Sequence, residues 1–211
     1  QALRELIRAF VGNNSFSEAE QFLTLLLKAN QQDREGWYLF GVLLLQNGYY
    51  TTAERAFSRA IEPGSPPGKA SVYRAVCQLH SSQRKEAEAA FASLAAQPQF
   101  ANDLDLLLGY AQLSYEDGDI RRAEALSGKA AMLSPANPEA ALWHARSLAR
   151  MGRWREALTT AERAAATAPE RPQTHNLLLR IHQQLGNASL AEREATWLRD
   201  HNERLAAAGK R

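Results

Sequence analysis

Residues 37–63 read WYLFGVLLLQNGYYTTAERAFSRAIEP, and this stretch decides the fold. Its first part carries large and small apolar residues at the spacing i, i+3, i+4, i+7 that is typical of one helix face: Trp37, Phe40, Gly41 and Leu44. A second set follows at helical spacing: Tyr50, Ala53, Phe57 and Ala60. Between them, Asn47-Gly48 is a helix stop, and Pro63 disfavours continuation of the second helix. The stretch therefore predicts two helices joined by a tight turn.

The same pattern recurs along the chain with a period of 34 residues. One small residue marks it at each recurrence: Ala19, Ala53, Ala87, Ala123, Ala157 and Ala191. Their separations are 34, 34, 36, 34 and 34, and Gly118, Gly152 and Gly186 follow the same period. Several interleaved series with one period indicate tandem repeats of a single supersecondary unit.

The signature residues of the second unit resemble the tetratricopeptide repeat: Trp37, Phe40, Gly41, Leu44, Gly48, Tyr50, Ala53, Phe57 and Ala60. This resemblance implies an all-α fold, a right-handed superhelical solenoid of antiparallel helix pairs. We expect a single array over residues 1–205, with repeats at about 1–33, 34–67, 68–101, 104–137, 138–171 and 172–205. Residues 206–211 form a C-terminal tail in this interpretation.

The third repeat departs from the pattern. Arg74 and Gln78 stand at positions that are usually apolar, and Ser81-Ser82 replaces the turn glycine. Two additional residues follow, around Asn102-Asp103. We interpret this as a local irregularity of the stack, such as a change of twist, or as ordinary drift in a surface helix.

Composition excludes several classes of protein. A formal net charge of +2 gives no basic excess for nucleic acid, and 45% hydrophobic residues are ordinary for a folded chain. The single Cys77 excludes an internal disulfide and is expected to be a buried, inert thiol. No apolar run is long enough to cross a membrane, so we expect no membrane insertion. The excess of arginine over lysine, with abundant alanine, indicates a bacterial source.

No motif for catalysis or for cofactor binding is present, and we expect no enzyme activity. The histidines give no i, i+4 pair, so we expect no metal site and assign them to packing or to the surface.

The resemblance also implies that the first helix of each repeat lines an inner groove. Helical geometry then selects the predicted peptide-binding residues: Tyr38, Leu39, Val42, Val72, Tyr73, Val76, Leu108, Trp143, Arg146 and Arg180. An apolar strip with polar edges is typical of a binding surface. The alternative is that tight curvature buries these residues against adjacent repeats.

The partner is expected to be a peptide or protein segment with apolar anchors. Acidic groups on it would meet arginines near the ends of the groove, which are Arg4, Arg8, Arg146 and Arg180. Chaperone-binding members of the family hold a C-terminal carboxylate with lysine, asparagine and arginine. Lys69 matches one such place, but Leu39 and Tyr73 stand where asparagine and a basic residue are needed. We therefore expect no chaperone-tail clamp.

The favoured function is a non-catalytic scaffold that binds a peptide or protein segment in its groove. The alternative is an accessory domain of a larger enzyme or of a secretion or export assembly, for example in polysaccharide or glycosyl transfer. RNA binding by a helical-repeat protein needs a basic groove, and the predicted groove is mostly apolar. Helical spacing at the first residues suggests that the numbering begins inside a longer chain. We expect the cytoplasm, or the periplasm if a leader was removed.

Overall fold

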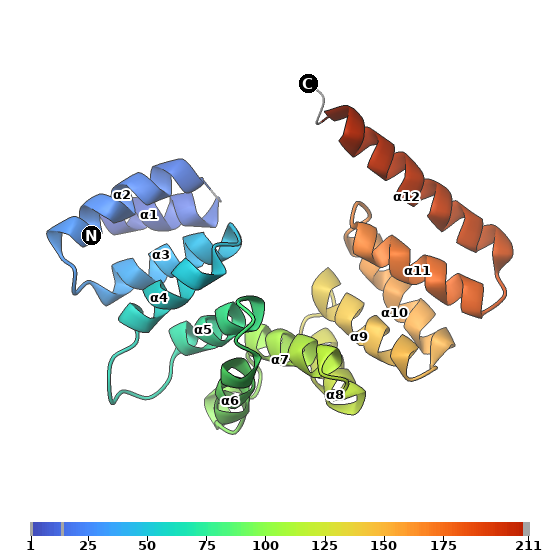
Figure 1. Cartoon of the computed structure of the whole chain (residues 1–211), viewed down its shortest axis with the longest axis horizontal. Helices are drawn as coiled ribbons and strands as arrows, with labels where there is room; N and C mark the ends of the chain where they lie inside the picture. The colour runs from blue at the N-terminus through green and yellow to red at the C-terminus, as the bar shows by residue number, and fades with distance from the viewer. Residues whose placement is uncertain (1, 14, 209–211) are drawn as a thin grey trace. The chain divides into compact units, whose positions relative to one another are not determined.

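The computed structural model describes residues 2–13 and 15–208, and within these ranges it contains helices and no strand (Figure 1). The prediction of an all-α fold is therefore confirmed. The helices are α1 (Ala2–Gly12), α2 (Phe16–Ala29), α3 (Arg34–Gln46), α4 (Tyr50–Ala60), α5 (Lys69–His80), α6 (Arg84–Ala95), the short 3₁₀ helix η1 (Pro98–Phe100), α7 (Leu104–Glu116), α8 (Ile120–Leu133), α9 (Pro138–Arg150), α10 (Trp154–Thr167), α11 (Pro172–Gln184) and α12 (Ala188–Ala208). Part of the predicted tail, residues 209–211, lies outside the described residues.

Tight turns of one kind join several of the helix pairs. After α3, the Tyr49 N–H donates to the Leu44 carbonyl (2.9 Å) and the Gly48 N–H donates to the Leu45 carbonyl (3.1 Å). These two bonds satisfy carbonyls at the end of α3 and require a left-handed residue, which Gly48 supplies at φ 77°. The chain then reverses into α4, so that α3 and α4 pack side by side (Figure 1).

The third repeat makes this turn without glycine. Ser82 adopts φ 62°, and the Gln83 N–H donates to the Gln78 carbonyl at 3.0 Å. A side chain in the left-handed region is strained by contact of its Cβ with the backbone. The irregularity that the sequence shows here therefore changes the energy of the turn rather than its geometry.

The described residues form two compact units, with the boundary inside α7 between Gly109 and Tyr110. In unit 1 (residues 1–109), Phe57 of α4 is fully buried in the core cluster that α3, α4 and α5 share. A Cβ added at Gly41 of α3 would lie only 2.7 Å from the Phe57 ring, so the ring fills space that glycine leaves open. Phe91 of α6 makes the same kind of contact with Gly109 of α7.

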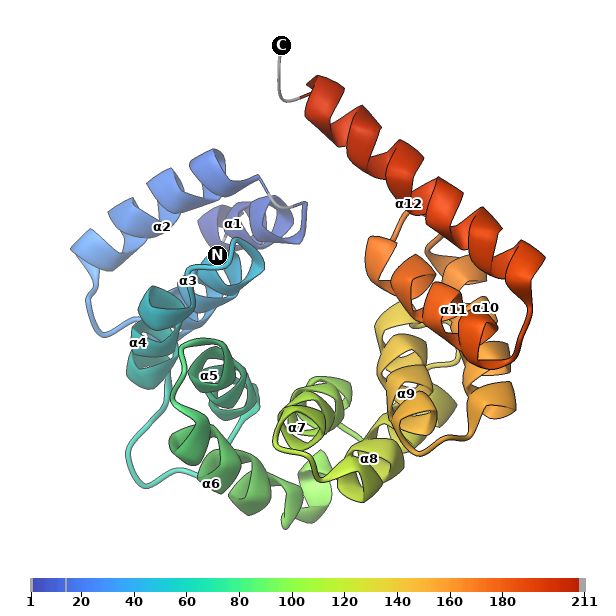
Figure 2. The same ribbon diagram turned by 45° about the vertical axis from the view of Figure 1, so that its right-hand side comes forward.

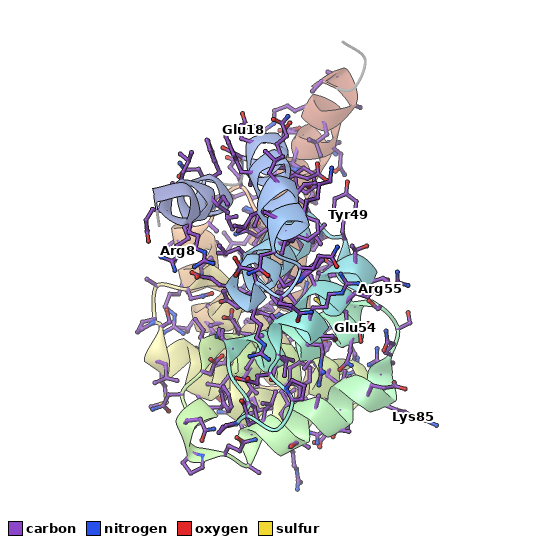
Figure 3. The ribbon with its side chains drawn as sticks, turned by 90° about the vertical axis from the view of Figure 1, so that its left-hand side faces the viewer. Arg8, Glu18, Tyr49, Glu54, Arg55 and Lys85 are labelled. Carbon is purple, nitrogen blue, oxygen red and sulfur yellow. The ribbon has the colours of Figure 1, made fainter. Side chains whose placement is uncertain are left out.

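In unit 1, the first helix α1 and the second helices α4 and α6 have labelled residues at opposite edges of one view. Figure 3 shows Arg8, from the first helix α1, at one edge, and Glu54 and Arg55 of α4 with Lys85 of α6 at the other.

Polar residues in the third repeat are accommodated by a carboxylate of the second. Gln78 and Gln83 donate to the two carboxylate oxygens of Glu54, at 3.2 Å and 2.9 Å. Next to Gln78, Cys77 is a buried free thiol, as predicted, and burial raises its pKa to about 12.

Unit 2 (residues 110–211) ends in α12, which continues as one helix beyond its contact with α11 (Figure 2). His175 of α11 fastens the middle of α12: its ring stacks on Trp197 with centroids 3.6 Å apart. The His175 Nδ1 lies 2.6 Å from a Glu194 carboxylate oxygen, and its Nε2 lies 2.7 Å from the Pro169 carbonyl oxygen. This histidine therefore serves packing, as the sequence predicted.

Within the ranges that the structure describes, no helix has both the length and the apolar character needed to cross a membrane.

The close approach of α3 and α4 predicts the effect of a single methyl group. Gly41→Ala should lower the free energy of unfolding by about 1 to 2 kcal/mol, because overpacking against Phe57 costs about 1 to 3 kcal/mol and the gain in helix propensity returns less than 1. Chemical denaturation measures this. Gly12→Ala in α1 is the control, since nothing lies within 4 Å of the added Cβ. Equal stability of the two variants would contradict the packing argument.

The serine turn predicts a stabilising substitution. Ser82→Gly should raise the free energy of unfolding by about 0.5 to 1 kcal/mol, because relief of left-handed strain exceeds the entropy that glycine adds to the unfolded chain. The reciprocal change Gly48→Ser, at φ 77°, should lower stability by a similar amount. Thermal melting of both variants checks the pair, and a destabilising Ser82→Gly would show that the turn is unstrained.

Candidate functional site

The predicted groove residues all lie on the first helix of a repeat, but to different depths. Seven belong to unit 1 and three, Trp143, Arg146 and Arg180, belong to unit 2. Leu39, Val72 and Trp143 are buried, with at most 8% of their surface exposed. The half-buried residues are Tyr38, Val42, Tyr73, Val76, Leu108 and Arg146, and Arg180 is exposed. Burial of three members leaves a narrower surface for a partner than the sequence suggested.

A pair of tyrosines forms the middle of this surface in unit 1. Tyr38 of α3 and Tyr73 of α5 stack with ring centroids 6.2 Å apart. Phe57 lies against both rings, at 6.1 Å from Tyr38 and 5.5 Å from Tyr73. Burial raises the pKa of both phenols, so both are neutral hydrogen-bonding groups at physiological pH.

A lysine and two aspartates hold the tyrosine pair in place. The Lys69 Nζ lies 2.7 Å from both carboxylate oxygens of Asp103 and 2.7 Å from Asp105. The same ammonium lies 5.2 Å from the centre of the Tyr73 ring, and the negative charge of Asp105 helps to raise the pKa of the Tyr73 phenol. Burial by itself lowers the pKa of Lys69, but the hydrogen bonds to the two aspartates outweigh it and the net shift is upward. Asp103 also caps α7 by accepting from the Leu106 N–H.

A basic residue is bound by two acidic residues of the following repeat also between the first and second repeats of unit 1. Arg4 of α1 donates to Asp33 at 2.6 Å and lies 3.5 Å from Glu35. Asp33 caps α3 by accepting from the Gly36 N–H at 3.0 Å. In both places an acidic residue just before a first helix, and another two residues later, bind the basic residue of the preceding repeats.

This pairing corrects the expectation that Arg4 and Arg8 are available to an acidic partner. Arg8 donates to Glu5 at 2.6 Å and also to Glu35. Apart from Glu5, which is three residues from Arg8, the acids lie 27 to 36 residues away along the chain from Arg4, Arg8 and Lys69, so charge counts along the sequence miss these pairs. The one available signal was the acid-x-acid spacing of Asp33 and Glu35 and of Asp103 and Asp105.

A hollow of about 380 Å³ lies beside Tyr38, one member of the tyrosine pair, in unit 1. Its wall includes Glu35 and Tyr38 of α3, Ile61 and Pro66 of the connection between α4 and α5, and Lys69. The hollow offers one aromatic face, aliphatic carbons, and charged groups at its edge. That combination suits a side chain with an apolar body and a polar end.

In unit 2 the predicted residues form an aromatic and arginine cluster. The Trp143 ring lies 5.7 Å from that of Tyr115 in an edge-to-face arrangement. The Arg146 guanidinium lies 4.7 Å from the centre of the Trp143 ring, and that of Arg150 lies 5.8 Å from the centre of the Tyr115 ring. Burial lowers the pKa of Arg146, which marks a partly desolvated charge.

Among residues 2–13 and 15–208, no group of three or more His, Cys, Asp or Glu side chains is arranged to hold a metal ion.

Comparison with known proteins identifies similar sequences and folds. Two family models, both described as tetratricopeptide repeat, match residues 4–69 and 114–181. No curated protein sequence matches the chain significantly.

Several solved structures share the fold. PilF of Pseudomonas aeruginosa matches with a TM-score of 0.77 at 13% identity, over 98% of this chain and 96% of that chain. PilW, described as a widely conserved type IV pilus biogenesis factor, matches with 0.78 at 17% identity, over 94% and 91%. YrrB, described as having an unusual peptide-binding site, matches with 0.56 at 15% identity, over 81% and 87%. At these identities the likeness shows the fold, a solenoid of paired helices.

The Asp33 pairing predicts a dependence of stability on pH. Burial raises the pKa of Asp33, but hydrogen bonds from the Gly36 N–H and from Arg4 outweigh it, so the folded-state pKa lies below 3.8. A lowered carboxyl pKa stabilises the fold above the unfolded value and loses that effect as pH falls through the folded value. Asp33→Asn should therefore lower the free energy of unfolding by about 1 to 2 kcal/mol at neutral pH, and the difference should shrink as the pH falls below 3.8 and through the lowered folded-state pKa. Urea denaturation across this range measures it; a difference that is independent of pH would contradict the assignment.

Proposed function

Because this chain belongs to the tetratricopeptide-repeat family, we propose that it is a non-catalytic protein-interaction scaffold. Its first helices bind a peptide or protein segment from a partner. In unit 1 the contact surface comprises Tyr38, Val42, Tyr73, Val76 and Leu108, with Leu39 and Val72 packed behind them. In unit 2 it comprises Arg146 and Arg180, with Trp143 as the support of Arg146.

The tyrosine pair beside the hollow is the observation that carries this proposal. Tyrosine contributes a large apolar area together with a polar hydroxyl, and it is enriched among residues that dominate binding energy. Phe57 behind the rings and the Lys69–Asp105 network beside Tyr73 restrict their rotation before a partner arrives. Less side-chain entropy is then lost on binding, which favours affinity. The peptide-binding site described for YrrB, which has the same fold, supports a peptide as the ligand.

A second candidate is an accessory module of a larger assembly, such as a secretion or export machine. Its support is the likeness along almost the whole chain to PilW, which is described as a pilus biogenesis factor. The two candidates differ in the partner: a transient peptide for the first and a permanent subunit for the second.

The tyrosine surface is tested by two aromatic substitutions on the same helix. A partner is first recovered by pull-down with the wild-type chain. Tyr38→Ala should lower the affinity for that partner at least tenfold, which is about 1.4 kcal/mol, because it removes a central contact. Trp37→Ala is the control: Trp37 is also half-buried on α3 but packs on Phe40 and Arg59. Titration of the purified partner measures both, with melting curves beside them. Equal loss of affinity in the two variants, tracking their melting temperatures, would place Tyr38 in the core only.

A further inference from the structure

At one equivalent position of the first helices, the side chain is apolar in some repeats and basic in others. It lies eleven residues before the marker alanine of each repeat, and its occupants are Arg8, Val42, Val76, Gln112, Arg146 and Arg180. Residues at one register of the repeat occupy equivalent places on successive first helices. The position is therefore basic at α1, apolar at α3 and α5, and basic again at α9 and α11.

The arginines at this position differ in what they contact. Arg8 in unit 1 is paired with Glu5 and Glu35. Within residues 2–13 and 15–208, neither Arg146 nor Arg180 has a carboxylate within ion-pair distance or a side-chain hydrogen bond. Arg146 is the more informative of the two, because it is half-buried on the Trp143 ring. Glu139 attracts the Arg146 guanidinium electrostatically without a direct ion pair, and the same carboxylate lies 3.8 Å from Arg171. A partly desolvated cation without a direct ion pair is costly, and a ligand carboxylate would reduce that cost.

The surroundings strengthen the positive charge on this surface. Arg150 lies one turn after Arg146, over the Tyr115 ring. The α9 helix contains a single acidic residue, Glu139, which lies 3.8 Å from Arg171, and the α11 helix contains none. Unit 1 shows the opposite arrangement on its first helices, since Asp33, Glu35, Asp103 and Asp105 pair with Arg4, Arg8 and Lys69.

We propose that Arg146, Arg150 and Arg180, here called the arginine surface, bind an extended peptide segment through its Asp or Glu carboxylates. The proposal rests on the peptide-binding function proposed above and adds the charge of the ligand and the unit that reads it. Helices α9 and α11 contact one another. Packed helices lie about 10 Å apart and an extended peptide rises about 3.3 Å per residue, so carboxylates about three residues apart match Arg146 and Arg180.

A protein ligand fits this surface better than a nucleic acid does. The chain carries a net charge of only +2, and the acidic residues of unit 1 line its first helices. A polyanion would need a longer run of unpaired basic groups to release counterions. Short arginine–carboxylate pairs on aromatic supports are instead typical of acidic-motif recognition.

The test selects ligands from a random twelve-residue peptide library displayed on phage, with the wild-type chain as bait. We expect enriched peptides to carry Asp or Glu at intervals of about three residues. One enriched peptide is then synthesised. The double variant Arg146→Gln/Arg180→Gln should bind it with an affinity lower by about tenfold or more, which is the size of one lost charge-assisted contact. Replacing the acids of that peptide by Asn and Gln should weaken its binding to wild type equally, and should add no further loss in the double variant.

Matched variants separate the local contact from net charge and from folding. Arg121→Gln/Arg155→Gln removes the same charge from exposed positions on α8 and α10 and should bind like wild type. Arg146→Lys/Arg180→Lys keeps the charge and should retain the acidic preference even if Arg146→Gln loosens the packing on Trp143. Circular dichroism melting of each variant checks the fold.

Three outcomes would overturn the inference. Neutral enriched peptides that bind wild type and Arg146→Gln/Arg180→Gln alike would remove the acidic specificity and leave the proposed scaffold function intact. A twelve-nucleotide single-stranded RNA that binds the arginine surface more tightly than the enriched peptide would identify nucleic acid as the ligand. Failure to enrich any peptide would contradict the proposed peptide-binding function itself.

Discussion

The packing of unit 1 depends on the close approach of α3 and α4, where the Phe57 ring fills the space left by the missing side chain of Gly41. A methyl group at Gly41 would collide with that ring, so the helices can approach this closely only because residue 41 has no side-chain carbon. Phe57 also supports Tyr38 and Tyr73 on the first helices. A helix pair has too little apolar surface for a core of its own, and its stability comes from such contacts with its neighbours.

Charge pairing along the first helices gives the two units different surfaces. In unit 1, acidic residues at the start of a first helix bind Arg4 and Lys69 from preceding repeats, and these pairs also cap the helices through Asp33 and Asp103. Within the described residues of unit 1, Arg4 and Lys69 are therefore both ion-paired, and the surface beside them is formed by Tyr38 and Tyr73. In the described part of unit 2, residues 110–208, Arg146 and Arg180 have no such partners. In the proposed function, apolar side chains of a partner would therefore bind to unit 1, and its acidic side chains would bind to unit 2.

Local rules explain why the helices were predictable. Apolar spacing, turn glycines and prolines act within a few residues, and the helix pairs follow them closely. The left-handed conformation of Ser82 was not predicted; it keeps the turn of the other repeats although the usual glycine is absent. The depth of the proposed binding residues was less predictable. Leu39, Val72 and Trp143 lie at groove positions in the repeat but are buried, because neighbouring helices cover them. Helical periodicity predicts the direction in which a side chain points, but it does not predict how far neighbouring helices bury that side chain.

The sequence by itself determined the repeat, its paired helices, the family, and the first helices as carriers of the candidate surface, because all of these depend on spacing along the chain. Only the tertiary structure decided which charges are free. Arg4, Arg8, Arg146 and Arg180 are the same residue type, yet among the described residues Arg4 and Arg8 are paired with carboxylates and Arg146 and Arg180 are not. Ion pairing depends on distances of a few ångströms between residues that are about one repeat apart, and those distances exist only once the helices have packed.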